Sequence, residues 1–260
     1  MSCQGKETML RQTFVHVPRI GRATELNLWR SGIGCWEDFI ARYSEVPLPQ
    51  NRKSDVRLHI EKSIIRLEQQ DHRYFAQALP RQEMWRAYPD FPGKVAYLDI
   101  ETTGLFPLAD EITVIGIYDG KNVATFINGI NLDDVCQELK KYSVLITFNG
   151  LRFDIPFIRS FMADVQIDHL HIDLLYPLRK LGYRGGLKSI ERQLGIERES
   201  DVAHLTGFDA VRLWREYRRG SETALQTLVK YNSSDIVNLE YLMKFVYEEL
   251  KKRTLVSRDE

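Results

Sequence analysis

Two acidic side chains close a short apolar run, and their spacing gives the first chemical signal in the sequence. Asp99 and Glu101 end the stretch VAYLDIE, which is predicted to form a β-strand. Because side chains alternate along a strand, residues two apart point to the same face, so the two carboxylates face the same way. Such a pair favours a divalent cation between its members, since hard cations prefer oxygen ligands. The alternative is a strand end capped by polar residues, after which Thr102, Thr103 and Gly104 turn the chain.

A third acidic residue follows a second predicted strand. In the stretch FNGLRFDIPFI, Asn149 and Gly150 end that strand, and Asp154 opens a helix two residues before Pro156. Ligand crevices of α/β proteins lie at the carboxyl ends of strands, which is where this turn would place Asp154. An acid at a helix start also stabilises the helix as a cap. Taken alone, Asp154 therefore fits either a site residue or a helix cap.

A tyrosine and an aspartate stand four residues apart in a helical stretch near the end of the chain. Tyr231 and Asp235 lie in YNSSDIVNLEYL. Residues four apart share one face of a helix, so the two side chains are expected to be neighbours. An ordinary surface pair explains the same spacing. The sequence contains neither G-x-x-x-x-G-K-[ST] nor G-x-S-x-G, so P-loop enzymes and acyl-transfer enzymes with a nucleophile elbow find no support.

Taken together, the three elements resemble a known family. In chain order they read D-x-E, N-G-x-x-F-D and Y-x-x-x-D, which is similar to the pattern of the DEDD exonuclease superfamily with its RNase H-like fold. The tyrosine of the last motif resembles the DEDDy branch. The chain also looks like the YprB-like group of predicted exonucleases over about residues 95–250. That likeness is carried by the stretches YLDIETTGL, FNGLRFDIPFI, GGLKSIERQLGIER and YNSSDIVNLEYL.

The resemblance implies a metal-dependent 3′–5′ exonuclease that hydrolyses phosphodiester bonds by a two-metal-ion mechanism. It implies that four acids hold two divalent cations and that a tyrosine orients the attacking water. Asp99 is expected to be the bridging ligand, because it lies centrally on the first strand. The four metal-ligating and catalytic acids would be Asp99, Glu101, Asp154 and Asp235, and the catalytic tyrosine would be Tyr231. A set of carboxylates alone suits Mg²⁺ or Mn²⁺, whereas Zn²⁺ favours histidine and cysteine.

Four further residues are candidates for binding the substrate: Thr102, Thr103, Asn149 and Lys188. Asn149 would contact either the substrate or a nearby backbone group. Lys188 belongs to the basic run RKLGYRGGLKSIER, which would contact either phosphates or only solvent. The expected partner is DNA or RNA, most simply a single-stranded 3′ end. Two alternatives stay open, namely a structure-specific endonuclease on the same fold and a non-catalytic nucleic-acid-binding module.

The elements that must position these residues indicate an α/β fold. Strand-like runs before and after Asp119-Gly120 predict a hairpin, and later runs alternate with helices. Three antiparallel strands followed by parallel strands predict an RNase H-like mixed β-sheet flanked by helices. This domain is expected to span residues 94–260. Asn131 is predicted to cap the helix that follows the third strand.

Two helical segments are expected before this domain. Residues 49–93 are predicted to form a helical linker, which follows a proline-rich stretch. Residues 1–48 resemble a helix-hairpin-helix module, in which Val17, Ile20 and Gly21 match the turn and Arg19 replaces a glycine. The resemblance implies that backbone N–H groups of this turn contact a phosphate. A small helical docking module without nucleic-acid contact is the alternative.

The composition fits a globular protein that does not cross a membrane. Hydrophobic residues make up 43% and charged residues 28%, which excludes a disordered or fibrous chain. The 36 basic and 36 acidic side chains exclude a globally basic nucleic-acid coat, although a local basic surface remains compatible with them. Cys3, Cys35 and Cys136 are expected to be unpaired, which favours a reducing cytoplasm. The polar N-terminal stretch is unlike a signal peptide, and no apolar run is long enough for a membrane span.

Overall fold

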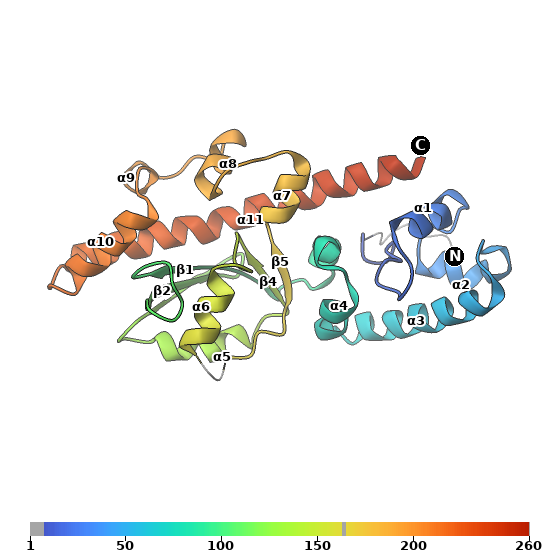
Figure 1. Cartoon of the computed structure of the whole chain (residues 1–260), viewed down its shortest axis with the longest axis horizontal. Coiled ribbons are helices and arrows are strands. Elements are labelled where there is room, and N and C mark those ends of the chain that lie inside the picture. Colours follow the sequence, from blue (N-terminus) through green and yellow to red (C-terminus); the bar gives the residue numbers. More distant parts are fainter. Residues whose placement is uncertain (1–7, 163–164, 260) are drawn as a thin grey trace. The chain divides into compact units, whose positions relative to one another are not determined.

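The computed structural model describes residues 8–162 and 165–259, which fold as two compact units (Figure 1). The first unit comprises Met1–Pro92 together with Tyr247–Glu260, and the second comprises Gly93–Val246. These units group the chain differently from the predicted three segments. The module and the linker fall in one unit, and the end of the last helix belongs to that unit as well.

A five-stranded mixed sheet forms the centre of the second unit. Its strand order is β3-β2-β1-β4-β5, in which β1, β2 and β3 pair antiparallel, and β4 and β5 extend the sheet in parallel. The predicted α/β class and the predicted change from antiparallel to parallel pairing are therefore confirmed. The strands are β1 (Val95–Thr102), β2 (Ile112–Tyr118), β3 (Val123–Ile127), β4 (Val144–Thr147) and β5 (Leu170–Asp173).

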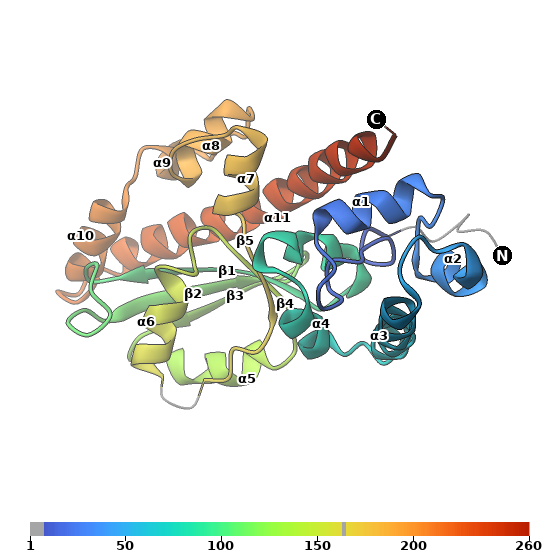
Figure 2. The ribbon, with the colours of Figure 1, turned by 45° about the vertical axis from the view of Figure 1, so that its right-hand side comes forward.

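Helices cover both faces of this sheet, as Figure 2 shows. One face packs against α5 and α6, and the other packs against α10 and the first part of α11. The helices of this unit are α5 (Val135–Leu139), α6 (Asp154–Phe161), α7 (Leu175–Leu181), α8 (Leu187–Gln193), α9 (Ser200–Ala203), α10 (Gly207–Tyr217) and α11 (Glu222–Asp259), the last of which continues into the first unit.

The alternation of side chains along β1 decides which residues face which layer. Ala96, Leu98 and Ile100 belong to the apolar core on the side of α5 and α6. Asp99 and Glu101 alternate with them, so they lie on the opposite face, which α11 covers. Strand β1 therefore buries an apolar face while it presents two carboxylates to the last helix.

The first unit is helical, and its largely apolar core also buries a cluster of charged side chains. Its helices are α1 (Arg22–Arg30), α2 (Trp36–Ala41), α3 (Gln50–Glu68) and α4 (His72–Ala78), followed by a 3₁₀ segment at Arg81–Asp90. The fully buried Arg86 donates to both carboxylate oxygens of Glu25 at 2.9 and 3.0 Å and to Glu83 at 2.7 Å. The guanidinium is thus compensated by hydrogen-bonded acids, as a buried charge requires.

Three local features bear on the expectations from the sequence. Helix α3 begins at Gln50, directly after Pro49, so the proline-rich stretch ends where the predicted helical segment begins. Asn131 makes no cap bond, since its side chain accepts from Ile127 N at 2.7 Å and donates to Thr125 O at 3.1 Å. Arg19 has a φ of 66°, a left-handed conformation that glycine adopts more easily.

The cysteines differ in part from expectation. Cys136 is a free thiol, whereas Cys35 is disulfide-bonded, so the expectation of unpaired cysteines is wrong at Cys35. Cys3 lies outside the described residues. None of the described helices is both long enough and apolar enough to cross a bilayer.

Candidate metal centre

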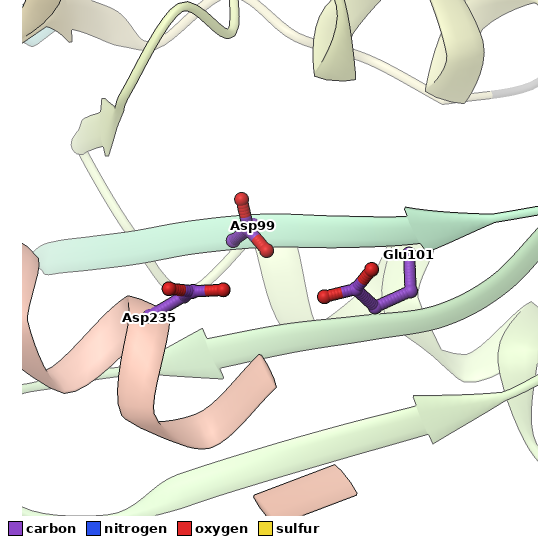
Figure 3. A group of neighbouring side chains, drawn as sticks. All are labelled: Asp99, Glu101 and Asp235. Carbon is purple, nitrogen blue, oxygen red and sulfur yellow. The ribbon is translucent and has the colours of Figure 1, made fainter. Parts of the chain in front are cut away.

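Three carboxylates from distant parts of the chain converge on the α11 side of the sheet. Asp99 and Glu101 extend from β1, and Asp235 extends from α11 towards them (Figure 3). One oxygen from each of the three lies within 4.8 Å of the other two. Glu101 and Asp235 are buried, and Asp99 is partly exposed. This spacing lets one cation contact all three residues, and oxygen donors of this kind suit Mg²⁺ or Mn²⁺.

A glycine on the neighbouring strand lets α11 approach this close. Gly116 of β2 pairs with Asp99 of β1. A Cβ atom at Gly116 would collide with Oδ1 of Asn232 and would lie 3.0 Å from Cδ1 of Ile236. Asn232 in turn donates to Oδ2 of Asp99 at 3.0 Å. Because Gly116 has no side chain, the helix that carries Asp235 can pack close to β2. Asn232 then orients the carboxylate of Asp99.

Asp154 lies at the start of α6, next to this group but outside the three closest acids. Its side chain is buried, and its Oδ1 has no hydrogen-bond partner within the described residues. The turn before it is fixed by Asp173, whose oxygens accept from the backbone N–H groups of Asn149 at 2.7 Å and Leu151 at 3.1 Å. A buried oxygen without a partner is costly, and a cation would satisfy it.

A cavity of about 390 Å³ opens beside the acids. Asp99, Glu101, Tyr231 and Asp235 line one side of it, and Lys188 lines it as well. The ammonium of Lys188 lies 4.4 Å from the centre of the Tyr231 ring and donates to the carbonyl of Leu205. The predicted pair on α11 thus faces a cavity instead of bulk solvent.

Three of the predicted substrate-binding residues lie away from the cavity lining. Thr102 Oγ1 donates to the carbonyl of Gly104 at 2.5 Å, and Thr103 Oγ1 accepts from Glu111 N at 2.9 Å. Asn149 takes a left-handed φ of 63°, and its N–H binds Asp173. These contacts shape the loops that follow the strands. Among the four candidates, Lys188 is the one that lines the cavity.

An arginine without a predicted role, the last residue of the stretch GGLKSIERQLGIER, also reaches the acids. Arg198, in the loop between α8 and α9, donates to Asp235 Oδ1 at 2.5 Å and binds Glu191 with two hydrogen bonds. Its side chain and that of Glu191 are both buried. Sequence reasoning missed Arg198, Glu191, Asn232, Asp173 and Gly116. Glu191, Arg198 and Asn232 lie within stretches that carry the family likeness, and Gly116 offered a further signal, since a glycine inside a strand often marks a close approach.

The crowded carboxylates hold their protons more tightly than acids in water. Burial raises the pKa of Asp154 to about 7 and the pKa of Asp235 to about 6, although Arg198 opposes the rise at Asp235. Burial and the neighbouring carboxylate of Asp235 raise the pKa of Asp99 and the pKa of Glu101 well above their usual range. Loss of solvent and like charges both disfavour the ionised form.

These raised pKa values predict that cation binding strengthens with pH. Protons compete with a cation for the same oxygens, so the association constant for Mn²⁺ should rise about tenfold per pH unit for each proton released. The window extends over about pH 6 to 7, where Asp235 and Asp154 titrate. Isothermal titration calorimetry at pH 6, 7 and 8 measures the effect, and an affinity that does not change over this range would contradict it.

The same shifts have a consequence for folding stability. A carboxyl group whose pKa is raised by folding contributes stability at low pH, and this contribution is lost as pH rises through the folded-state pKa. Without metal, the cluster therefore destabilises the fold above about pH 7. We expect Mn²⁺ to raise the melting temperature more at pH 8 than at pH 6, which thermal unfolding at both pH values can check.

Comparisons with known proteins agree with this architecture. Residues 96–247, more than half of the chain, match the family described as the RNase_H superfamily. No functionally curated protein matches the chain in sequence.

Solved structures with a similar fold include the family B DNA polymerase from the hyperthermophilic archaeon Pyrobaculum calidifontis, with 16% identity and a TM-score of 0.49. That match covers 60% of this chain and 24% of the polymerase, so the chain spans about a quarter of that protein. NrnC of Brucella melitensis bound to pGG is 21% identical, with 65% of this chain and 80% of NrnC covered and a TM-score of 0.44.

Proposed function

Because the chain belongs to the RNase H superfamily, we propose that it is a metal-dependent 3′–5′ exonuclease that hydrolyses phosphodiester bonds of nucleic acid. The observation that carries this proposal is the convergence of Asp99, Glu101 and Asp235 within 4.8 Å, at the edge of a cavity. The donor chemistry of this cluster fits hard divalent cations. The three acids come from two segments that are distant in the sequence, β1 and α11.

The proposed metal ligands are Asp99, Glu101, Asp154 and Asp235, which would hold two Mg²⁺ or Mn²⁺ ions. The unpartnered Oδ1 of Asp154 supports its inclusion, because a cation would satisfy this buried oxygen. When bound, the two ions supply an activated water nucleophile and stabilise the charge on the leaving oxygen. The carboxylates position that chemistry and neutralise the cations.

Tyr231 has a different proposed role. Burial raises its pKa above the usual value, and the carboxylates of Asp235 and Glu101 add to the rise. The phenol is therefore protonated at neutral pH. It acts by orienting a water molecule through a hydrogen bond, and it does not act as a general base. Lys188, against the Tyr231 ring, brings a positive charge to the same cavity.

The proposed substrate is a DNA or RNA strand with a free 3′ end. The cavity volume of about 390 Å³ lies in the range of small-ligand pockets, roughly 300–1,000 Å³, which favours capture of one terminal nucleotide. The positive charge of Lys188 suits the phosphate that links this nucleotide to the next. Its ammonium is already held by Leu205, which fixes where that charge lies.

The direct test compares linear and circular single-stranded substrates. With Mn²⁺, we expect linear DNA or RNA carrying a 5′ label to shorten stepwise and to release mononucleotides, while a circle stays intact and EDTA stops the reaction. Cleavage of the circle would replace the proposal with an endonuclease. A gel shift without metal-dependent turnover would replace it with a binding module.

A further inference from the structure

Arg198 is held in place by a buried partner. Its Nε and Nη2 donate to the two carboxylate oxygens of Glu191 at 2.6 and 2.7 Å. The side chain of Arg198 is 5% exposed and that of Glu191 is 1% exposed. A two-pronged contact of this kind is geometrically specific and among the stronger hydrogen-bonded pairs. Arg198 therefore has a fixed position.

The same guanidinium touches one oxygen of Asp235. Nη2 of Arg198 donates to Oδ1 at 2.5 Å, which leaves Oδ2 to a cation. Arg198 is not among the described residues that line the cavity, and its hydrogen bond to the clustered acids is the one to Asp235. The contact thus assigns different partners to the two oxygens of a proposed metal ligand.

Helix α11 secures the pair from a second point. Asn238 donates to Oε1 of Glu191 at 2.9 Å, and it lies three residues after Asp235 on α11. Glu191 and Arg198 are thereby tied to the same stretch of helix that presents Asp235. Their formal charges sum to zero, although the guanidinium contacts Asp235 directly and opposes the rise in its pKa.

We infer that Glu191 and Arg198 form a positioning pair, which holds Asp235 so that it binds a divalent cation through one oxygen. This inference rests on the proposed metal centre. Hydrogen-bonded partners of metal ligands orient those ligands, and their removal weakens metal affinity by about 10- to 100-fold. Neither Glu191 nor Arg198 is among the described residues that line the cavity. The pair is therefore expected to act on cation affinity by holding Asp235, and not by binding the substrate.

The decisive variant removes the pair and keeps the net charge. We expect E191M/R198M to bind Mn²⁺ about tenfold more weakly than the wild type, as measured by electron paramagnetic resonance of free Mn²⁺. The matched control is R212M/E216M, which removes a surface pair joined at 2.8 Å. The control should keep wild-type affinity. Arg198→Lys keeps the positive charge but cannot make the paired hydrogen bonds of a guanidinium. Its Mn²⁺ affinity should lie between those of the wild type and the double variant.

Other outcomes have distinct meanings. A lower melting temperature with unchanged Mn²⁺ affinity would overturn the inference, because it would show a purely structural role. If the double variant does not fold, Glu191→Gln tests the inference instead. It keeps the size of the side chain but weakens the hydrogen-bonded ion pair with Arg198. Unchanged affinity in that variant would also overturn the inference. Absence of Mn²⁺ binding in the wild type would instead contradict the proposed metal centre.

Discussion

Asp99→Asn is expected to lower Mn²⁺-dependent cleavage by about 10³-fold or more. Asp99 lines the cavity and lies within 4.8 Å of two other acids, so its charge contributes to the whole centre. Catalytic metal ions stabilise transition-state charge by several kcal/mol, and each 1.4 kcal/mol corresponds to about tenfold in rate. Single-turnover cleavage of a labelled oligonucleotide at saturating substrate measures the loss.

The same variant should keep its fold. Asparagine has the size of aspartate, and it removes a negative charge that repels Glu101 and Asp235. We therefore expect the metal-free melting temperature to stay the same or to rise. Asp133→Asn makes the identical change at an exposed position and should retain full activity. Wild-type cleavage by Asp99→Asn would remove Asp99 from the proposed centre.

Gly116→Ala is expected to lower activity by about 100-fold, although residue 116 touches no substrate. Its new methyl group would meet Oδ1 of Asn232, so α11 or the Asn232 side chain must move. Either movement disturbs Asp99, whose Oδ2 accepts a hydrogen bond from Asn232. A misplacement of about 1 Å near reacting groups can cost about 10²-fold in rate.

The effect on activity should exceed the effect on stability. Overpacking in a core costs about 1–3 kcal/mol, which an ordinary domain tolerates. Ile117→Val is the matched control, because Ile117 is the next residue of β2 and packs into the core on the other face of the sheet. It should lower stability by about 0.5–1.5 kcal/mol and leave the cleavage rate unchanged. Equal activity in the two variants would contradict the role given to Gly116.

The sequence predicts those features that depend on local periodicity. The alternation of β1 places Asp99 and Glu101 on one face, and the four-residue spacing places Tyr231 and Asp235 on one face of α11. The hairpin at Asp119 and the mixed sheet follow from turn chemistry and from the order of strands and helices. These patterns are set by neighbours in the chain, so they can be read without a structure.

Features that depend on contacts between distant segments could not be predicted in this way. Arg198 lies in a loop without periodicity, and its partners Glu191 and Asp235 are recognisable only after α8 and α11 are placed together. Asn232 stands in a stretch of weak helix formers, and its purpose depends on the register that puts Gly116 opposite Asp99. Asn131 was misread, because its side chain bonds the strand before it and not the helix after it.

The division of the acids between β1 and α11 has a consequence for protein synthesis. A ribosome releases β1, with Asp99 and Glu101, long before it releases the helix that carries Asp235. The incomplete nascent chain therefore lacks one of the three clustered acids and cannot form the proposed metal centre. The cluster of acids forms only when translation has passed Asp235 and the last helix has docked on the sheet.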